Sequence, residues 1–107
     1  MSRALGAAVA LSLSLCGNGA LAKIRDGDQL LQQCTATIGA HMVFCFGYID
    51  SVMDSLLANN EVCVASEVDD PQLRNIVVLD LKNNPGLRRL TAPELVARAL
   101  TEAFPCQ

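Results

Sequence analysis

The stretch LQQCTATIGAHMVFC, residues 31–45, decides how this chain folds, because it places a cysteine on either side of a glycine. On one continuous helix, Cys34 and Cys45 would be about 16 Å apart, too far to bond. Glycine at Gly39 readily takes the left-handed conformation that ends a helix. If a second helix begins at about His41, the two cysteines face each other across an antiparallel helix pair. The stretch therefore predicts a helical hairpin closed by a disulfide.

The apolar residues of the rest of the chain recur at helical spacing, and no run alternates like a half-buried strand. A first helix is expected from Asp28 to about Ile38 and a second from about His41 to Ala58. The buried stripe of the second should comprise Cys45, Ile49, Val52, Met53 and Leu56.

A third helix should begin with Asp70 as N-cap and Pro71 at its first position, and the sequence at 83–86 should end it. Thr91 and Glu94 have the spacing of a capping box that opens a fourth helix. Its buried stripe should comprise Leu95, Val96, Ala99, Leu100, Ala103 and Phe104. We therefore predict an all-α domain, a compact bundle of about four helices stapled by two disulfides.

Residues 1–22 have the three parts of a secretory signal peptide. Arg3 precedes an apolar run from Ala4 to Leu15, which is too short to span a bilayer. Ala20 and Ala22 are small residues at the −3 and −1 positions of the expected cut, as a signal peptidase requires. Lipidation at Cys16 and a retained anchor are the alternatives, but a lipoprotein needs a small residue before its cysteine. We expect cleavage after Ala22 and export to the periplasm.

Cleavage would leave residues 23–107 as a single helical domain with four cysteines and a net charge of −4. An even number of cysteines in a short exported chain indicates disulfides. Four cysteines allow three pairings, and the sequence alone does not decide among them. The hairpin favours Cys34–Cys45, which leaves Cys63–Cys106. The acidic balance argues against nucleic acid or an anionic membrane surface as a partner.

No residue pattern points to catalysis or to a metal site. His41, the single histidine, lies near cysteines that cannot act as nucleophiles once they are bridged. Asp50 and Asp54 share one helix face and could form an acid pair, although an exposed face is the simpler interpretation. The cysteines lack zinc-site spacing, and the acidic sequence at 26–28 lacks the later ligands of a calcium loop. We therefore expect a protein that is not an enzyme and needs no cofactor.

Two stretches are candidate binding surfaces. One is the polar connection between the second and third helices, which a disulfide at Cys63 would hold rigid; a pre-organised loop binds at lower entropic cost. An ordinary solvated loop is the alternative. Its candidate partner-binding residues are Asn59, Asn60, Glu61, Ser66, Glu67, Asp69 and Asp70. The other stretch is apolar surface at Met42, Val43 and Phe46, which is either a dimer face or part of a helix buried on two sides.

Three segments resemble a known family in their order and spacing, namely CFGYIDSVMD (45–54), CVASEVDDPQ (63–72) and APELVARALTEAFPC (92–106). Together they resemble the Tai/Rap-type immunity proteins, which accompany peptidoglycan amidase effectors of bacterial type VI secretion systems. The resemblance spans nearly the whole expected mature chain. Four positions depart from the usual residues of the family: Ser51, Ala65, Asp69 and Asn84.

The resemblance implies a small, exported, helical, disulfide-bonded protein without enzymatic activity. Such a protein binds a cell-wall amidase in the periplasm and blocks its cysteine–histidine active site, commonly as a dimer. By that analogy, the loop from Asn59 to Asp70 is expected to enter or cover the amidase cleft and so protect the producing cell. The alternative is a small disulfide-bonded periplasmic chaperone or envelope adaptor on the same scaffold. A chaperone should bind many clients at low pH, whereas an inhibitor should bind one enzyme stoichiometrically.

Overall fold

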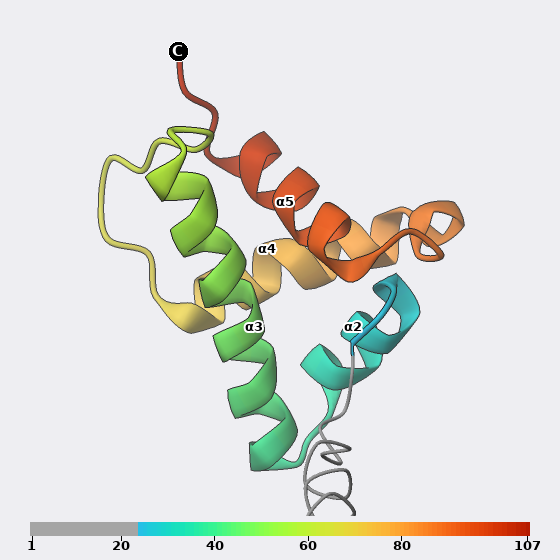
Figure 1. The fold of residues 1–107 in the computed structure, drawn as a ribbon. Coiled ribbons are helices and arrows are strands. Elements are labelled where there is room, and N and C mark those ends of the chain that lie inside the picture. Colours follow the sequence, from blue (N-terminus) through green and yellow to red (C-terminus); the bar gives the residue numbers. More distant parts are fainter. Residues whose placement is uncertain (1–23) are drawn as a thin grey trace, which may run out of the picture.

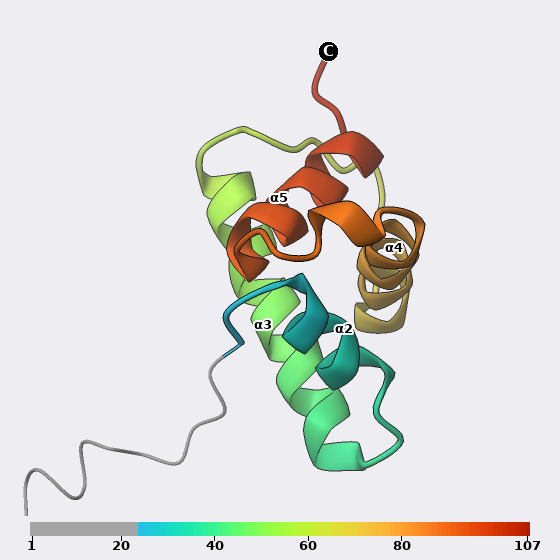
Figure 2. The same ribbon diagram turned by 90° about the vertical axis from the view of Figure 1, so that its right-hand side faces the viewer.

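The computed structural model describes residues 24–107, so the expected signal peptide and its cleavage site lie outside the described residues. The helices are α2 (Gly27–Thr35), α3 (Gly39–Ala58), α4 (Asp70–Asn83) and α5 (Ala92–Ala103), and a short 3₁₀ turn, η1 (Pro85–Leu87), follows α4. The long helix α3 contacts the other three. Figures 1 and 2 show α2 beside its N-terminal half, and α4 and α5 beside its C-terminal half. The expected all-α bundle is confirmed.

The core is apolar, and no polar or charged side chain of residues 24–107 is buried. The expected stripe of α3 is buried, except that Val52 is only partly covered. On α5, four of the six expected residues are buried and Phe104 packs against the core. Ala103 was expected to be buried but is exposed, because it lines an open groove between α4 and α5.

The turn between α2 and α3 begins three residues and ends two residues earlier than the sequence indicated. Helix α2 ends at Thr35 rather than near Ile38, and α3 begins at Gly39 rather than His41. Ala36 and Ile38 have extended backbones that reverse the chain, and Gly39 does not have a positive φ. The expectation that Gly39 ends the first helix is therefore wrong, because extended residues make this turn without left-handed geometry.

The start of α4 also differs from its prediction by one residue. The N-cap is Asp69, not Asp70: its carboxylate accepts a hydrogen bond from the Gln72 amide at 2.9 Å, and the Gln72 side chain accepts one from the Asp69 amide at 2.9 Å. Of the two adjacent aspartates, only Asp69 has a glutamine three residues on, so only Asp69 can form this reciprocal pair. The predicted end is confirmed, since α4 stops at Asn83.

Helix α5 begins after Thr91 as expected, but without the predicted capping box. The Thr91 hydroxyl donates to the Glu94 carboxylate at 2.7 Å and caps no backbone amide. The first amide of the helix, that of Ala92, instead donates to the carbonyl of Arg25 at 3.0 Å. The Arg25 carbonyl therefore satisfies one free amide of this helix end, although not the amide that a Thr91 cap would bind.

The same contact packs the N-terminus of α2 tightly against the segment before α5. The Gly27 amide donates to the Arg88 carbonyl at 2.7 Å, and Gly27 is buried. A Cβ atom at Gly27 would lie 2.8 Å from both Cα and the carbonyl oxygen of Arg88. Asp26 accepts a hydrogen bond from the Gln29 amide at 3.0 Å, so this aspartate caps α2. Glycine is required here because the two backbones approach too closely for a side chain.

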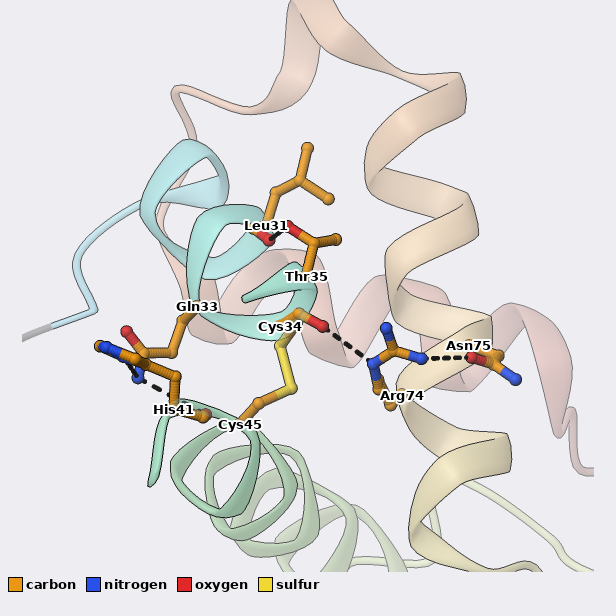
Figure 3. Close-up of a disulfide and its surroundings, with 8 residues drawn as sticks. All are labelled: Leu31, Gln33, Cys34, Thr35, His41, Cys45, Arg74 and Asn75. Atoms are coloured by element: carbon orange, nitrogen blue, oxygen red, sulfur yellow. Dashed lines mark hydrogen bonds between the residues drawn. A yellow bond between two sulfur atoms is a disulfide. The ribbon is translucent and has the colours of Figure 1, made fainter. Parts of the chain in front are cut away.

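Both predicted disulfides are present. Cys34–Cys45 joins α2 to α3 with a Cα–Cα distance of 5.1 Å, and both residues are completely buried (Figure 3). Cys63–Cys106 joins the loop before α4 to the segment after α5, with a Cα–Cα distance of 4.9 Å, and both residues are exposed. The two bonds therefore differ in role: one is part of the core, and the other fixes the surface.

Candidate partner-binding loop

The connection between α3 and α4, residues 59–69, leaves α3 through a well-defined stop. Asn60 is the one non-glycine residue of the described chain with a positive φ, 58°. Its amide donates to the Leu57 carbonyl at 3.1 Å, and the Glu61 amide donates to the Leu56 carbonyl at 2.9 Å. These two bonds form a Schellman motif, with asparagine where glycine is usual. The first residues of the loop are therefore as ordered as the helix they end.

Three further contacts hold the middle of the loop. The Val62 side chain is buried in the core. The Cys63 amide donates to the Phe104 carbonyl at 3.0 Å, and Cys63 is bonded to Cys106. Val64 and Val68, one on each side of the loop tip, pack partly against the core. The loop is consequently fixed at both ends, and a short exposed tip, residues 65–67, lies between them.

The seven candidate residues of this loop divide into two groups. Asn59, Asn60 and Asp69 shape the backbone: Asn59 also donates from its side chain to the Ser55 carbonyl at 2.9 Å, and Asp69 caps α4. The other group, which lies on the surface or faces another carboxylate, comprises Glu61, Ser66, Glu67 and Asp70.

The surface group contains the residues best placed to meet a partner. The side chains of Glu61, Ser66 and Glu67 are exposed and form no hydrogen bond or ion pair with any other residue of the described chain. A partner would therefore not have to break an intramolecular contact to reach them. The residues that cap the helices are thus different from the exposed residues of this short loop.

Asp70 adds charge where the loop joins α4. Its carboxyl lies against that of Asp50 on α3, and Asp54 is nearby. Burial raises the pKa of Asp50, and hydrogen bonding and repulsion from Asp70 raise it further. The expected pairing of Asp50 with Asp54 is thus the weaker interaction, because the chain brings Asp70 closer than sequence spacing could indicate. The loop and the adjacent ends of α3 and α4 form a negatively charged surface.

The residues considered for catalysis have structural contacts. The side-chain amide of Gln33 lies 2.8 Å from His41 Nδ1 across the α2–α3 hairpin (Figure 3). Cys34 and Cys45, the cysteines nearest to His41 in the sequence, are bonded to each other. Within residues 24–107, no group of three or more His, Cys, Asp or Glu side chains could hold a metal ion. In the same part of the chain, no helix has the length and apolar character needed to cross a membrane.

The apolar surface expected on α3 is present. Val43 is 70% exposed, whereas Met42 and Phe46 are partly covered. This side of α3 is therefore open to solvent at Val43 and is not buried on two sides.

Residues 26–106 match the family model of the Rap1a immunity proteins. This chain is a Rap1a immunity protein. Rap-type immunity proteins neutralise effectors of type VI secretion systems and are generally not enzymes. No curated protein and no solved structure matches the chain. The resemblance seen in three segments of the sequence is thereby confirmed at the level of the family, which covers all four helices and both disulfides.

Sequence reasoning missed two features that shape the loop of this Rap1a protein. One is the buried side chain of Val62. The polar residues before it in the sequence give no indication that it is buried, and the available sequence feature is that an apolar residue stands next to a cysteine. The other is the left-handed Asn60, for which two consecutive asparagines after an apolar helix are the available signal, because asparagine tolerates this conformation better than most residues. Together they determine which side of the loop faces the solvent.

Proposed function

We propose that this Rap1a protein is a periplasmic immunity protein that binds a peptidoglycan amidase effector of a type VI secretion system and occludes its active site. The amidase target and the periplasmic location are inferred from the resemblance of the sequence, the signal-peptide pattern and the two disulfides. The observation that carries the mode of action is the clamped loop at 59–69. It is the exposed segment whose backbone is fixed by a helix stop, a buried valine and a disulfide.

A fixed loop suits an inhibitor for an energetic reason. A flexible loop loses conformational freedom when it enters a cleft, at a cost of about 1–2 kcal/mol for each ordered residue. The clamp at Cys63 imposes much of that order before the partner arrives. The exposed carboxylates at Glu61 and Glu67 then favour an amidase cleft with basic residues at its rim, since complementary charge increases the association rate.

The experiment uses a purified cysteine–histidine amidase encoded beside this protein. Excess oxidised immunity protein should abolish hydrolysis of peptidoglycan, and the two proteins should form a stable complex. If the amidase remains fully active, it is not the target of this protein, and an amidase-inhibiting function is refuted for that pair.

A second set of variants tests the loop separately. Reversing both charges, with Glu61→Arg and Glu67→Arg, should weaken binding about tenfold or more, which corresponds to about 1.4 kcal/mol. Arg89→Glu is the matched control, because Arg89 is exposed between η1 and α5, far from the loop along the chain. All variants should keep the melting temperature of the wild type, since these side chains form no hydrogen bond or ion pair within the described residues. If the loop variant inhibits the amidase as well as the wild type does, the loop is not the binding surface, although the protein can still be an inhibitor.

The family resemblance also favours a homodimer, and the exposed Val43 on α3 is the surface we propose for it. Val43→Asp should then convert the dimer to a monomer in light scattering. A wild-type protein that is monomeric at high concentration would remove this part of the proposal.

A further inference from the structure

A groove between α4 and α5 contains no residue of the loop and has no assigned role. Its volume is about 270 Å³. Two apolar residues of α4 and two alanines of α5 form its floor, and one carboxylate from each helix stands at its rim. The floor residues are Ile76, Leu79, Ala99 and Ala103, and the rim residues are Asp80 and Glu102.

The floor is apolar surface that the fold itself does not use. Leu79 is 60% exposed, although its neighbours Val77 and Val78 are buried. Across the groove, Ala99 and Ala103 are one helical turn apart and have the smallest side chains that still favour a helix. Small residues on one wall and a protruding leucine on the other leave room for the apolar side chains of a third helix. This is the geometry in which an amphipathic helix binds a groove.

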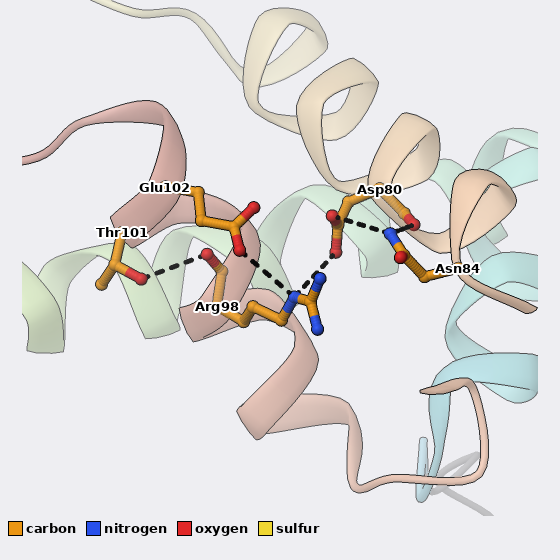
Figure 4. A network of polar contacts seen from close by, with 5 residues as sticks. All are labelled: Asp80, Asn84, Arg98, Thr101 and Glu102. Atoms are coloured by element: carbon orange, nitrogen blue, oxygen red, sulfur yellow. Dashed lines mark hydrogen bonds and ion pairs between the residues drawn. The ribbon is translucent and has the colours of Figure 1, made fainter. Parts of the chain in front are cut away.

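The rim carries more negative than positive charge. Figure 4 shows a single guanidinium, that of Arg98, between the carboxylates of Asp80 and Glu102. Its Nε lies 3.4 Å from Glu102 Oε1 and 3.9 Å from Asp80 Oδ2, and it forms no hydrogen bond within the described chain. Burial raises the pKa of Asp80, the charge of Arg98 lowers it, and the charge of Glu102 raises it. Asp80 also accepts a hydrogen bond from the Asn84 side-chain amide at 3.2 Å, whereas Glu102, whose side chain is 61% exposed, has only Arg98 as a partner within the described chain. A second cation would therefore be stabilised beside Glu102.

We propose that the α4–α5 groove is a docking surface for an amphipathic helix of a protein partner, in which a Lys or Arg flanks the apolar face. The apolar face would cover Leu79 and the alanines, and the cation would lie beside the exposed Glu102 carboxylate. A second copy of this chain is a poor occupant, because a two-fold contact through the groove would bring acidic rim against acidic rim. The proposal does not rest on the amidase assignment, since no residue that lines the groove belongs to the loop at 59–69.

The probe is a synthetic amphipathic helix of about 15 residues with an apolar Leu/Ala face flanked by lysines, together with otherwise identical peptides carrying glutamine or glutamate. Each is titrated into the whole oxidised protein at low salt, and binding is followed by fluorescence anisotropy and amide chemical shifts. The lysine peptide should bind most tightly and the glutamate peptide least. The shifts should cluster on the facing residues of α4 and α5.

Two variants tie the binding to the groove. Leu79→Ser should weaken the lysine peptide about tenfold, because docking would cover a leucine that is now mostly exposed. Glu102→Gln should weaken it about threefold and reduce its salt dependence, as expected for one rim charge. Leu57→Ser is the matched control, since Leu57 is 43% exposed on α3 and should have no effect on this peptide.

Three results would overturn the proposal. The first is that no peptide binds, or that the charge order is reversed. The second is that the shifts map to α3 or to the loop instead of the groove. The third is that groove resonances move with protein concentration in the absence of peptide, which would make a second copy the occupant. Each of these results leaves inhibition of the amidase unaffected, so the two proposals fail separately.

Discussion

Replacing Cys63 and Cys106 with serine should cost the domain a large part of its stability. The bond joins residues 43 positions apart, and a cross-link over that length removes unfolded-chain entropy worth about 4 kcal/mol. Both positions are exposed, so serine should add little strain of its own. The hydrogen bond from the Cys63 amide to the Phe104 carbonyl can persist in the variant. The expected loss of about 4 kcal/mol compares with the 5–15 kcal/mol typical of a whole domain.

The assay is urea unfolding followed by circular dichroism, supported by thermal melts. A loss of this size should lower the melting temperature by about 20 °C in a domain of this length. Amide hydrogen exchange should also become faster between residues 61 and 68, whereas α3 keeps the closed Cys34–Cys45 hairpin. Stability and loop order should therefore fall together.

The wild-type protein under mild native-state reduction provides the matched control. A reductant should open the exposed Cys63–Cys106 bond before the buried Cys34–Cys45 bond, and the partly reduced protein should unfold like the double-serine variant. A loss below about 1 kcal/mol would refute the chain-entropy estimate. Reduction of the buried bond first would refute the inference from exposure.

Three further substitutions have expected outcomes. Gly27→Ala should destabilise the domain by about 1–3 kcal/mol in urea unfolding, because the added methyl group would meet the Arg88 backbone at 2.8 Å; an unchanged midpoint would contradict this. Arg74→Leu should lower the free energy of unfolding by about 1.5–3 kcal/mol in the same assay. The reason is that the Arg74 Nε donates to the Cys34 carbonyl at 2.8 Å and its charge lies at the C-terminal end of α2 (Figure 3). Arg74→Lys should restore only part of the lost stability. Asp50→Asn should raise the melting temperature at neutral pH. Burial and Asp70 raise the pKa of Asp50 in the folded state, so the folded state holds this proton more tightly than the unfolded chain. The free energy of unfolding should then fall as pH rises from the ordinary pKa through the raised one, and that part of the pH dependence should vanish in the variant.

The helices could be predicted because they depend on short-range periodicity, and the expected hairpin favoured Cys34–Cys45, which left Cys63–Cys106. The residues of α3 that face the core recur every three or four positions, and this spacing is visible in the sequence. The position of Cys34 and Cys45 around a turn then limits which sulfurs can meet. The error of two to three residues in the bounds of that turn leaves the pairing unchanged, because both cysteines still face each other across the hairpin.

The exact helix caps and the contacts between residues far apart in the sequence could not be predicted in the same way. The choice of Asp69 over Asp70 depends on a reciprocal bond with Gln72, and the cap of Ala92 depends on Arg25, which lies far away in the sequence. The bond from Arg74 to the Cys34 carbonyl spans 40 residues. Such contacts follow from how the helices pack, so no local pattern identifies them.

The polarity of the loop made it a candidate, but polarity did not indicate which of its residues cap helices and which are simply exposed. Asn59, Asn60 and Asp69 are as polar as Glu67, and only the backbone geometry shows that they stop or start helices. A polar residue next to a helix end has two uses, capping and binding, and composition does not distinguish them.

The span of the Cys63–Cys106 bond also sets an order of events during oxidative folding. Cys34 meets Cys45 within one hairpin, so this bond can close before the later helices exist. Cys63 must wait until the chain has been made through α5, because its partner follows both α4 and α5. If the first two sulfurs are then already paired and buried as in the folded protein, they are no longer available as wrong partners for Cys63. The loop is thus the last part of the surface to mature, and its rigidity marks a molecule in which every helix is already in place.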